Sequence, residues 1–208
     1  MPKENKIKPS FPLKGKVVFF ATSNINKFNE ARNILSEYGI AVGLLRVKSV
    51  EIQSSSIRKI AEHSVIDAFK RCHLPVIVED AGLFIEALNG FPGPYAAYAY
   101  RTLHNEGVLK LMENVENRSA LFQSAIAYCD SNAYVPTCFE GEVKGEITLK
   151  IRIEQGKSGF GFDPIFMPFG SKKTFAEMTL KEKNRFSHRA KAVCKFAEWY
   201  QKTNASTP

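Results

Sequence analysis

The 208-residue sequence lacks the features that mark membrane, secreted and zinc-binding proteins. It contains no apolar run of about 18 residues, so no transmembrane helix is expected. The first residues, MPKENKIKPSFPLK, include no apolar segment of the kind found in signal peptides. The four cysteines, Cys72, Cys129, Cys138 and Cys194, form no C-x-x-C pair, which argues against a zinc site or a redox motif. We therefore expect reduced thiols and a cytoplasmic location.

Further absences narrow the class of protein. The sequence has no Walker A motif, which argues against a P-loop enzyme, and it has no internal repeat or low-complexity linker. Hydrophobic residues make up 44% and charged residues 24% of the chain, as in ordinary globular proteins. The prolines and lysines of residues 1–14 indicate a flexible N-terminal tail. We expect a single two-lobed domain over residues 15–203.

The formal net charge of +8 lies partly in that tail. An excess of positive charge favours a polyanionic ligand, although a solvated basic surface explains it equally well. A basic nucleic-acid-binding protein is a further alternative. The sequence shows no basic stripe with interleaved aromatic residues, so we expect no stable nucleic-acid partner.

Strand and helix patterns alternate over the first eighty residues, which is typical of an α/β layer fold. Turn-forming residues then interrupt two longer stretches, and this indicates antiparallel hairpins. The pattern as a whole favours two lobes around a long mixed sheet. The strands are expected at residues 16–21, 42–47, 75–79, 120–129 and 134–153.

Helix signals lie between the first strands and again near the C-terminus. A serine among residues 54–56 is expected to cap the second helix. A short helix is expected at residues 107–112. Thr179 and Glu182 have the spacing of a capping box, and Ser187 can cap the last helix.

Polar residues follow the first strand, where the next helix begins. Free backbone N–H groups and partial positive charge at a helix N-terminus suit phosphate. Thr22, Ser23 and Asn24 can add donors, and Lys27 adds a full charge. The alternative is plain capping of a strand-to-helix turn.

Two acidic residues, Glu79 and Asp80, lie where the third strand is expected to end, before Ala81 and Gly82. Strand ends in α/β sheets are common ligand sites. Adjacent carboxylates are unfavourable to bury together unless a cation or a base role holds them, and carboxylate oxygens suit Mg²⁺. Glu51 is a third acidic residue after a strand-like stretch. The alternative is a solvated turn.

The segment SGFGFDPIF, residues 158–166, combines glycines with aromatic rings. Glycine permits close backbone approach, and Phe160 and Phe162 could stack on a base. Asp163, before a proline, is a fixed acceptor. The alternative is a turn that closes a hydrophobic core.

Basic residues cluster near the starts of the last two helices, at Lys183, His188 and Arg189. Helix N-termini prefer anions, so the helix dipole does not explain cations at these positions. This mismatch suggests an anionic or a carbonyl ligand.

Together these segments resemble the inosine triphosphate pyrophosphatase family over about residues 16–201. Each motif alone is weak, but six in the family's order are specific, and they are most similar to the archaeal branch. The matching pieces are TSNINKFNE, VEIQ, VEDAGLFIEALNGFPGPY, SGFGFDPIF, KTFAEM and KEKNRFSHR.

The resemblance implies an α/β fold with an elongated central mixed sheet, flanking helices and a nucleotide groove between the two lobes. It also implies a homodimer that requires Mg²⁺. The implied reaction is hydrolysis of non-standard purine nucleoside triphosphates, such as ITP, dITP and XTP, to the monophosphate and pyrophosphate. The open alternative is a Maf-like pyrophosphatase of other modified nucleotides.

The resemblance also assigns a role to each matching residue. The phosphate contacts are assigned to Thr22, Ser23, Asn24, Lys27 and the backbone of Ala81. The metal ligands are Glu51 and Asp80, and Asp80 is also the general base. Phe160 is assigned to stack on the purine, Asp163 to accept from its ring N–H, and Lys183 to support the nucleotide, with Gly161 and Phe162 among the substrate-binding residues. His188 and Arg189 contact the 6-oxo group of the purine.

The chain departs from the family pattern at four positions. Ala81 replaces the usual serine, so one hydroxyl contact to phosphate is absent or passes to the backbone N–H. Asn26 replaces a glycine, Phe162 replaces a tyrosine or tryptophan, and Ala190 replaces a glycine. None of these changes removes a proposed catalytic group.

Overall fold

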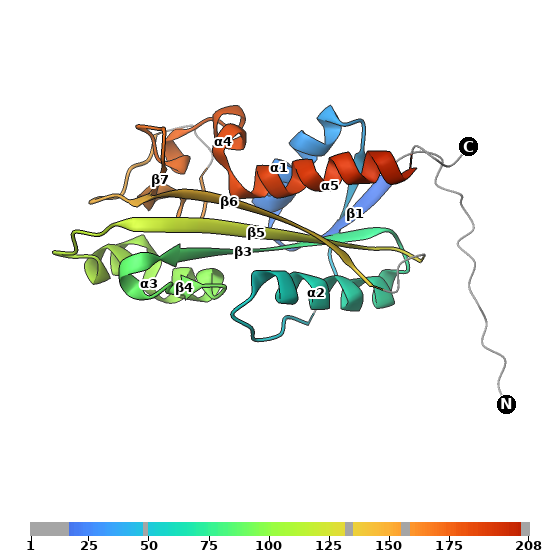
Figure 1. The fold of residues 1–208 in the computed structure, drawn as a ribbon, viewed down its shortest axis with the longest axis horizontal. Coiled ribbons are helices and arrows are strands. Elements are labelled where there is room, and N and C mark those ends of the chain that lie inside the picture. Colours follow the sequence, from blue (N-terminus) through green and yellow to red (C-terminus); the bar gives the residue numbers. More distant parts are fainter. Residues whose placement is uncertain (1–16, 48–49, 132–134, 155–158, 205–208) are drawn as a thin grey trace.

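The computed structural model describes residues 17–47, 50–131, 135–154 and 159–204. The expected tail, residues 1–14, and residue 134 lie outside these ranges. A seven-stranded mixed sheet runs the length of the molecule, in the order β2-β1-β3-β5-β6-β7, with β4 paired to β3 (Figure 1). Its strands are β1 (Val17–Ala21), β2 (Ala41–Leu45), β3 (Val76–Ile85), β4 (Pro92–Gly93), β5 (Ser119–Cys129), β6 (Thr137–Ile147) and β7 (Phe166–Pro168).

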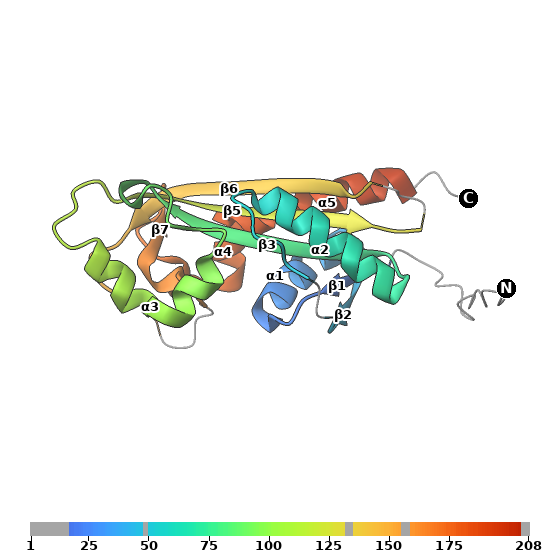
Figure 2. The ribbon, with the colours of Figure 1, turned by 90° about the horizontal axis from the view of Figure 1, so that it is seen from below.

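Helices cover both faces of this sheet. The α-helices are α1 (Ile25–Glu37), α2 (Ile57–Cys72), α3 (Ala96–Leu111), α4 (Leu180–Phe186) and α5 (His188–Asn204). α1, α4 and α5 lie on one face, and α2 and α3 lie on the other, as both views show (Figures 1 and 2). Short 3-10 turns are η1 (Glu86–Leu88), η2 (Asp163–Ile165) and η3 (Phe175–Glu177). The expected α/β class with an elongated mixed sheet is confirmed.

Local signals placed several elements correctly. β1 pairs in parallel with both β2 and β3, as alternating strands and helices require. Ser56 caps α2 by accepting a hydrogen bond from the backbone N–H of Lys59. Thr179 and Glu182 form the expected capping box of α4, and the Ser187 hydroxyl accepts from the backbone of Ala190 at the start of α5.

The expected end of the third strand at Glu79 is wrong, because β3 continues to Ile85. β5 pairs with β3 from Val76 to Ile85, whereas β1 pairs with β3 only at its beginning. Pairing with β5 therefore overrides the turn signal of Asp80-Ala81-Gly82. Glu79 and Asp80 lie inside a strand, where successive side chains point to opposite faces.

Two other boundaries differ from expectation. α3 begins at Ala96 rather than at residue 107 and bends at His104, whose φ is 54°. β6 ends at Ile147, and residues 148–153 form no strand, although the expected strand extended to 153. Both boundaries depend on packing that the local sequence does not contain.

The hydrophobic core is divided between the two halves of the sheet. One cluster joins α1 and α5 to one face, including Val18, Ile126 and Phe196. A second joins α2 to the opposite face, and a third packs α3 and the η turns around the far ends of β3 and β5. In the described part of the chain, no helix is long and apolar enough to cross a membrane.

Candidate active site

The turn between β1 and α1 carries the residues expected to bind phosphate. The Asn24 side chain caps α1 by accepting from the backbone N–H groups of Asn26 and Lys27, at 3.0 and 3.3 Å. The Thr22 hydroxyl accepts from the Asn24 N–H at 3.1 Å, and Ser23 is exposed. The capping alternative is therefore realised for Asn24. It leaves Lys27 as the charged group of this turn that reaches the neighbouring strand.

Lys27 reaches Glu79 on β3. Its ammonium lies 2.8 Å from Oε2 of Glu79, whose side chain is fully buried. The other carboxylate oxygen, Oε1, accepts from the Ser124 hydroxyl at 2.6 Å and from Nε of Arg189 at 3.1 Å. Burial acts to raise the pKa of Glu79, but the charges of Arg189 and Lys27 outweigh it and hold this pKa well below its usual range. Glu79 is thus an ionised counter-ion on the face covered by α5.

Asp80 lies on the opposite face of the same strand. Val78, two residues earlier, packs in the cluster formed with α2, which identifies that face. Oδ2 of Asp80 is buried and has no hydrogen-bond partner among the described residues. Burial raises the pKa of Asp80 to about 7, and the charges of Glu79 and Glu51 act in the same direction, against Lys27.

This environment fits a divalent cation. Asp80 offers an unpartnered carboxylate oxygen, and exposed Glu51 is close enough for its charge to raise the Asp80 pKa. The described residues contain no group of three or more His, Cys, Asp or Glu side chains arranged around one metal position. Two carboxylates suffice for Mg²⁺, which commonly binds one or two together with water and substrate phosphate.

A second buried cluster surrounds Phe160, the ring expected to stack on the base. The Lys183 side chain is 1% exposed, and its ammonium contacts Asp163 at 2.6 Å and Glu30 at 2.7 Å. The same ammonium lies 4.7 Å from the centre of the Phe160 ring, and the Arg189 guanidinium carbon lies 5.5 Å from it. Asp163 also accepts from the Phe160 N–H at 2.8 Å. The structure therefore brings Phe160, Asp163, Lys183 and Arg189 together in one place.

Glu30 is part of this cluster, although the sequence motifs did not single it out. Its carboxylate contacts both Lys183 and Arg189. Burial acts to raise its pKa, yet the two cations lower it below the usual value. A sequence signal existed, because Glu30 is an acid within the apolar stripe of Ala31 and Ile34 on α1 and follows Lys27 by one helical turn.

His188 stacks on Phe122, with parallel rings 4.7 Å apart. Its Nδ1 atom is buried and has no partner among the described residues. Burial and the neighbouring charge of Arg189 lower the pKa of His188 well below its usual value, so the ring is neutral at pH 7. His188 is therefore an uncharged donor or acceptor, and not a cation as its basic neighbours in the sequence suggest.

The start of α5 lies against β6 because of Gly141. A Cβ atom at this position would come within 2.1 Å of the His188 carbonyl oxygen. Glycine therefore allows the helix to approach the sheet closely and brings His188 and Arg189 to their places. Substitution of Gly141 would displace both residues.

Two expected contacts belong to packing instead. Phe162 is buried and meets the Tyr100 ring edge-on at 5.4 Å, so the alternative of a core turn holds for this residue. Gly161 adopts a φ of +60°, and its carbonyl accepts a hydrogen bond from Asn105. Gly161 thus shapes the loop that presents Phe160.

Ala81 lies on β3, opposite Ser124 of β5.

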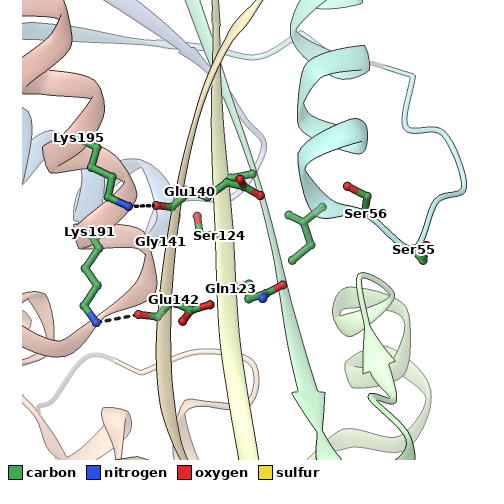
Figure 3. Close-up of a pocket in the computed structure, with 11 residues that line it drawn as sticks. Ser55, Ser56, Gln123, Ser124, Glu140, Gly141, Glu142, Lys191 and Lys195 are labelled. Atoms are coloured by element: carbon green, nitrogen blue, oxygen red, sulfur yellow. Dashed lines mark hydrogen bonds between the residues drawn. The ribbon is translucent and has the colours of Figure 1, made fainter.

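A cavity of about 510 Å³ lies between the start of α2 and strands β5 and β6 (Figure 3). Ser56, Gln123 and Glu140 line it, and Lys191 and Lys195 donate to backbone carbonyls of β6 at its edge. None of the residues assigned from the sequence lines this cavity. Of the assigned residues, Lys27, Phe160, Asp163, Lys183 and Arg189 belong to the connected cluster described above, whereas Asp80 lies on the opposite face of β3.

The chain is similar to known proteins over most of its length. The model of the Ham1 family matches residues 18–199, nearly the whole described chain. The chain belongs to the Ham1 family. This confirms the family resemblance that the motifs indicated.

Several named proteins are similar over most of the chain. A dITP/XTP pyrophosphatase of Methanopyrus kandleri is 50% identical over 88% of this chain and 96% of its own length. One of Thermococcus kodakarensis is 46% identical over 86% of this chain and 95% of its own length. Among solved structures, a HAM1 protein from Coxiella burnetii is 29% identical with a TM-score of 0.76, covering 89% of this chain and 98% of that protein.

Proposed function

We propose that this Ham1-family chain hydrolyses dITP, XTP and ITP to the nucleoside monophosphate and pyrophosphate. The observation that carries the proposal is the buried cluster that joins Lys27, beside the phosphate turn, to Arg189 and Lys183 around Phe160. Such a cluster offers cations for phosphate at one end and an aromatic face with hydrogen-bonding groups at the other. The named function of the archaeal relatives supports the same reaction.

Lys27 is placed to neutralise the triphosphate. Its ammonium already lies against Glu79 and is partly exposed, so a phosphate oxygen can replace part of its solvent. Neutralisation matters because the negative phosphates repel an attacking water molecule. The free backbone N–H groups of the first turn of α1 add partial positive charge.

Asp80 is proposed to accept the proton of the attacking water. The water oxygen bonds to phosphorus, the anhydride oxygen between the α- and β-phosphates leaves, and the products are the monophosphate and pyrophosphate. Before a cation binds, a pKa of about 7 leaves the carboxyl close to ionisation near neutral pH, and a bound cation would favour its ionised, basic form. The carboxylate oxygen that does not hold the cation would accept the proton.

Glu51 and Asp80 are the residues that would hold Mg²⁺. A cation bound there would neutralise phosphate charge and lower the pKa of a coordinated water. The unpartnered oxygen of Asp80 supports this assignment. A homodimer is proposed from the family resemblance, and the cytoplasmic location stays a prediction from the sequence.

Selectivity is proposed to come from Arg189 and His188. Arg189 uses Nη1 and Nε on Glu30 and Glu79, which leaves further N–H groups for a 6-oxo acceptor. Adenine presents an amino donor there instead. A site built for one hydrogen-bond polarity can reject the wrong partner by roughly 10⁴-fold.

The test is pyrophosphate release from ITP, XTP, dITP, ATP and GTP, with and without Mg²⁺. We expect release from the first three, at least 100-fold lower kcat/KM for ATP, and loss of activity with chelator. Comparable kcat/KM for ATP and ITP would contradict the proposed selectivity. Preference for modified pyrimidine nucleotides would favour the Maf-like alternative.

A further inference from the structure

An unbroken chain of ion pairs joins the phosphate end of the site to its base end. Four of its ion pairs have N···O distances of 2.6–3.1 Å, and a fifth ion pair joins Arg189 to Glu30. The charges alternate in sign along the chain, with three cations and three anions. In order, the members are Lys27, Glu79, Arg189, Glu30, Lys183 and Asp163.

Each inner member of this chain is shared between two partners. Glu79 is held by Lys27 and Arg189, and Arg189 by Glu79 and Glu30. Apart from Lys27, whose side chain is 19% exposed, the members are almost wholly buried. Water cannot screen such contacts, so a change at one pair alters the balance at the next.

The Ser124 hydroxyl fixes one end of Glu79. It donates to Oε1, the oxygen that also faces Arg189, whereas Oε2 faces Lys27. The carboxylate therefore cannot swing freely between its two cations. A loss of charge at the Lys27 side must be met by a stronger interaction with Arg189.

We propose that this chain of ion pairs couples the binding of the two halves of the substrate, the phosphates and the base. A phosphate that draws Lys27 away from Glu79 leaves the carboxylate to Arg189, and so holds the guanidinium in place for the base. Pyrophosphate and inosine should then bind with positive coupling. In this role Glu79 is a positioning residue on the face opposite Asp80, and not a metal ligand. The inference rests on the proposed function for the identity of the two ligands.

The experiment measures the coupling directly. Inosine is titrated calorimetrically into the full chain at constant Mg²⁺, without and with saturating pyrophosphate. We expect the Kd for inosine to fall at least fivefold in the presence of pyrophosphate, a typical size for coupling between sites. By thermodynamic reciprocity, inosine must lower the Kd for pyrophosphate by the same factor.

The variants locate the path of coupling. Glu79→Gln and Glu30→Gln should bring the coupling factor close to one, because each removes a shared charge. Ser124→Ala keeps all six charges and removes one hydrogen bond, so it should reduce the factor while the protein stays folded. The matched control is Glu142→Gln, because Glu142 is an exposed acid that does not belong to the chain of ion pairs. This variant should keep the wild-type coupling factor.

A coupling factor of one in the wild type, meaning that pyrophosphate does not change the Kd for inosine, overturns the inference. A coupling factor that stays at the wild-type value in both Glu79→Gln and Ser124→Ala also overturns it. Pyrophosphate release from ITP is measured on the same preparations. Normal release without coupling rejects the coupling alone. No release from ITP with coupling intact rejects the proposed reaction alone, and absence of binding by either ligand rejects both.

Discussion

Replacing Asp80 with asparagine should raise the free energy of unfolding above neutral pH, even though it removes a group proposed to act in hydrolysis. Burial raises the pKa of this carboxyl from 3.8 to about 7. The folded protein therefore binds the proton more tightly than the unfolded chain does. Ionising Asp80 opposes folding, and a neutral side chain of the same shape avoids that penalty.

The sign and size follow from linkage. Below pH 3.8 the carboxyl is protonated in both states and contributes nothing to the pH dependence. Between pH 3.8 and about 7 the unfolded chain has lost the proton and the folded protein has kept it, so stability falls as pH rises. Each pKa unit is worth about 1.4 kcal/mol, so a shift of about three units amounts to at most about 4 kcal/mol at pH 8.

The assay is urea unfolding of the wild type and Asp80→Asn at pH 4.5, 5.5, 6.5 and 7.5, with chelator present. The stability advantage of the variant should grow with pH and level off above about pH 7. Asp67→Asn is the matched control: its carboxyl accepts from the Val50 N–H and pairs with Arg71, so its pKa is lowered and the same substitution should destabilise the protein. A difference between wild type and Asp80→Asn that is constant across this range would refute the reasoning.

The same site gives further predictions. Because the Asp80 carboxyl must ionise to act as a base and a bound cation favours its ionised form, kcat/KM for ITP at saturating Mg²⁺ should rise with pH and level off below about 7; a flat pH profile would argue against this role. Phe160→Ala should raise KM for ITP by tenfold or more, since base stacking contributes about 1–3 kcal/mol. The inhibition constant of tripolyphosphate, which has no base, should change little when it competes with ITP. Arg189→Met should destabilise the protein by about 3–5 kcal/mol in thermal or urea unfolding, because Glu30 and Glu79 lose a buried partner. Millimolar Mg²⁺ should raise the Tm of the wild type and not that of Glu51→Gln, as measured by calorimetry.

Local signals were sufficient for the parts of the fold that depend on neighbouring residues. The cap at Ser56, the capping box of Thr179 and Glu182, and the turn after β1 are each specified within four residues, and all occur as expected. The structure brings Lys183 and Arg189 beside Phe160, as the resemblance implied, but their roles in binding stay predictions. The caps and the turn, by contrast, involve contacts that are close in sequence.

The misses share a different cause. Asp80-Ala81-Gly82 has the composition of a turn, but pairing with β5, more than forty residues away, keeps it extended. Phe162 has a ring suited to stacking on a base, but in the structure this ring is buried and packs against Tyr100 of α3. Glu30 makes its two ion pairs across more than 150 residues of sequence. Each case depends on a partner that no local pattern contains.

The continuation of β3 past Glu79 also explains how two adjacent acids acquire opposite properties. In a turn, both carboxylates would share one solvent environment and titrate alike. In a strand, the pleat sends Glu79 to the face of α5, where Arg189 and Lys27 keep it charged, and sends Asp80 to the face of α2, where its oxygen has no partner. Environments that push two carboxyl pKa values apart are how a site obtains one fixed charge and one exchangeable proton from the same residue type. The strand geometry, more than the residue identities, therefore separates the proposed positioning role of Glu79 from the proposed catalytic role of Asp80.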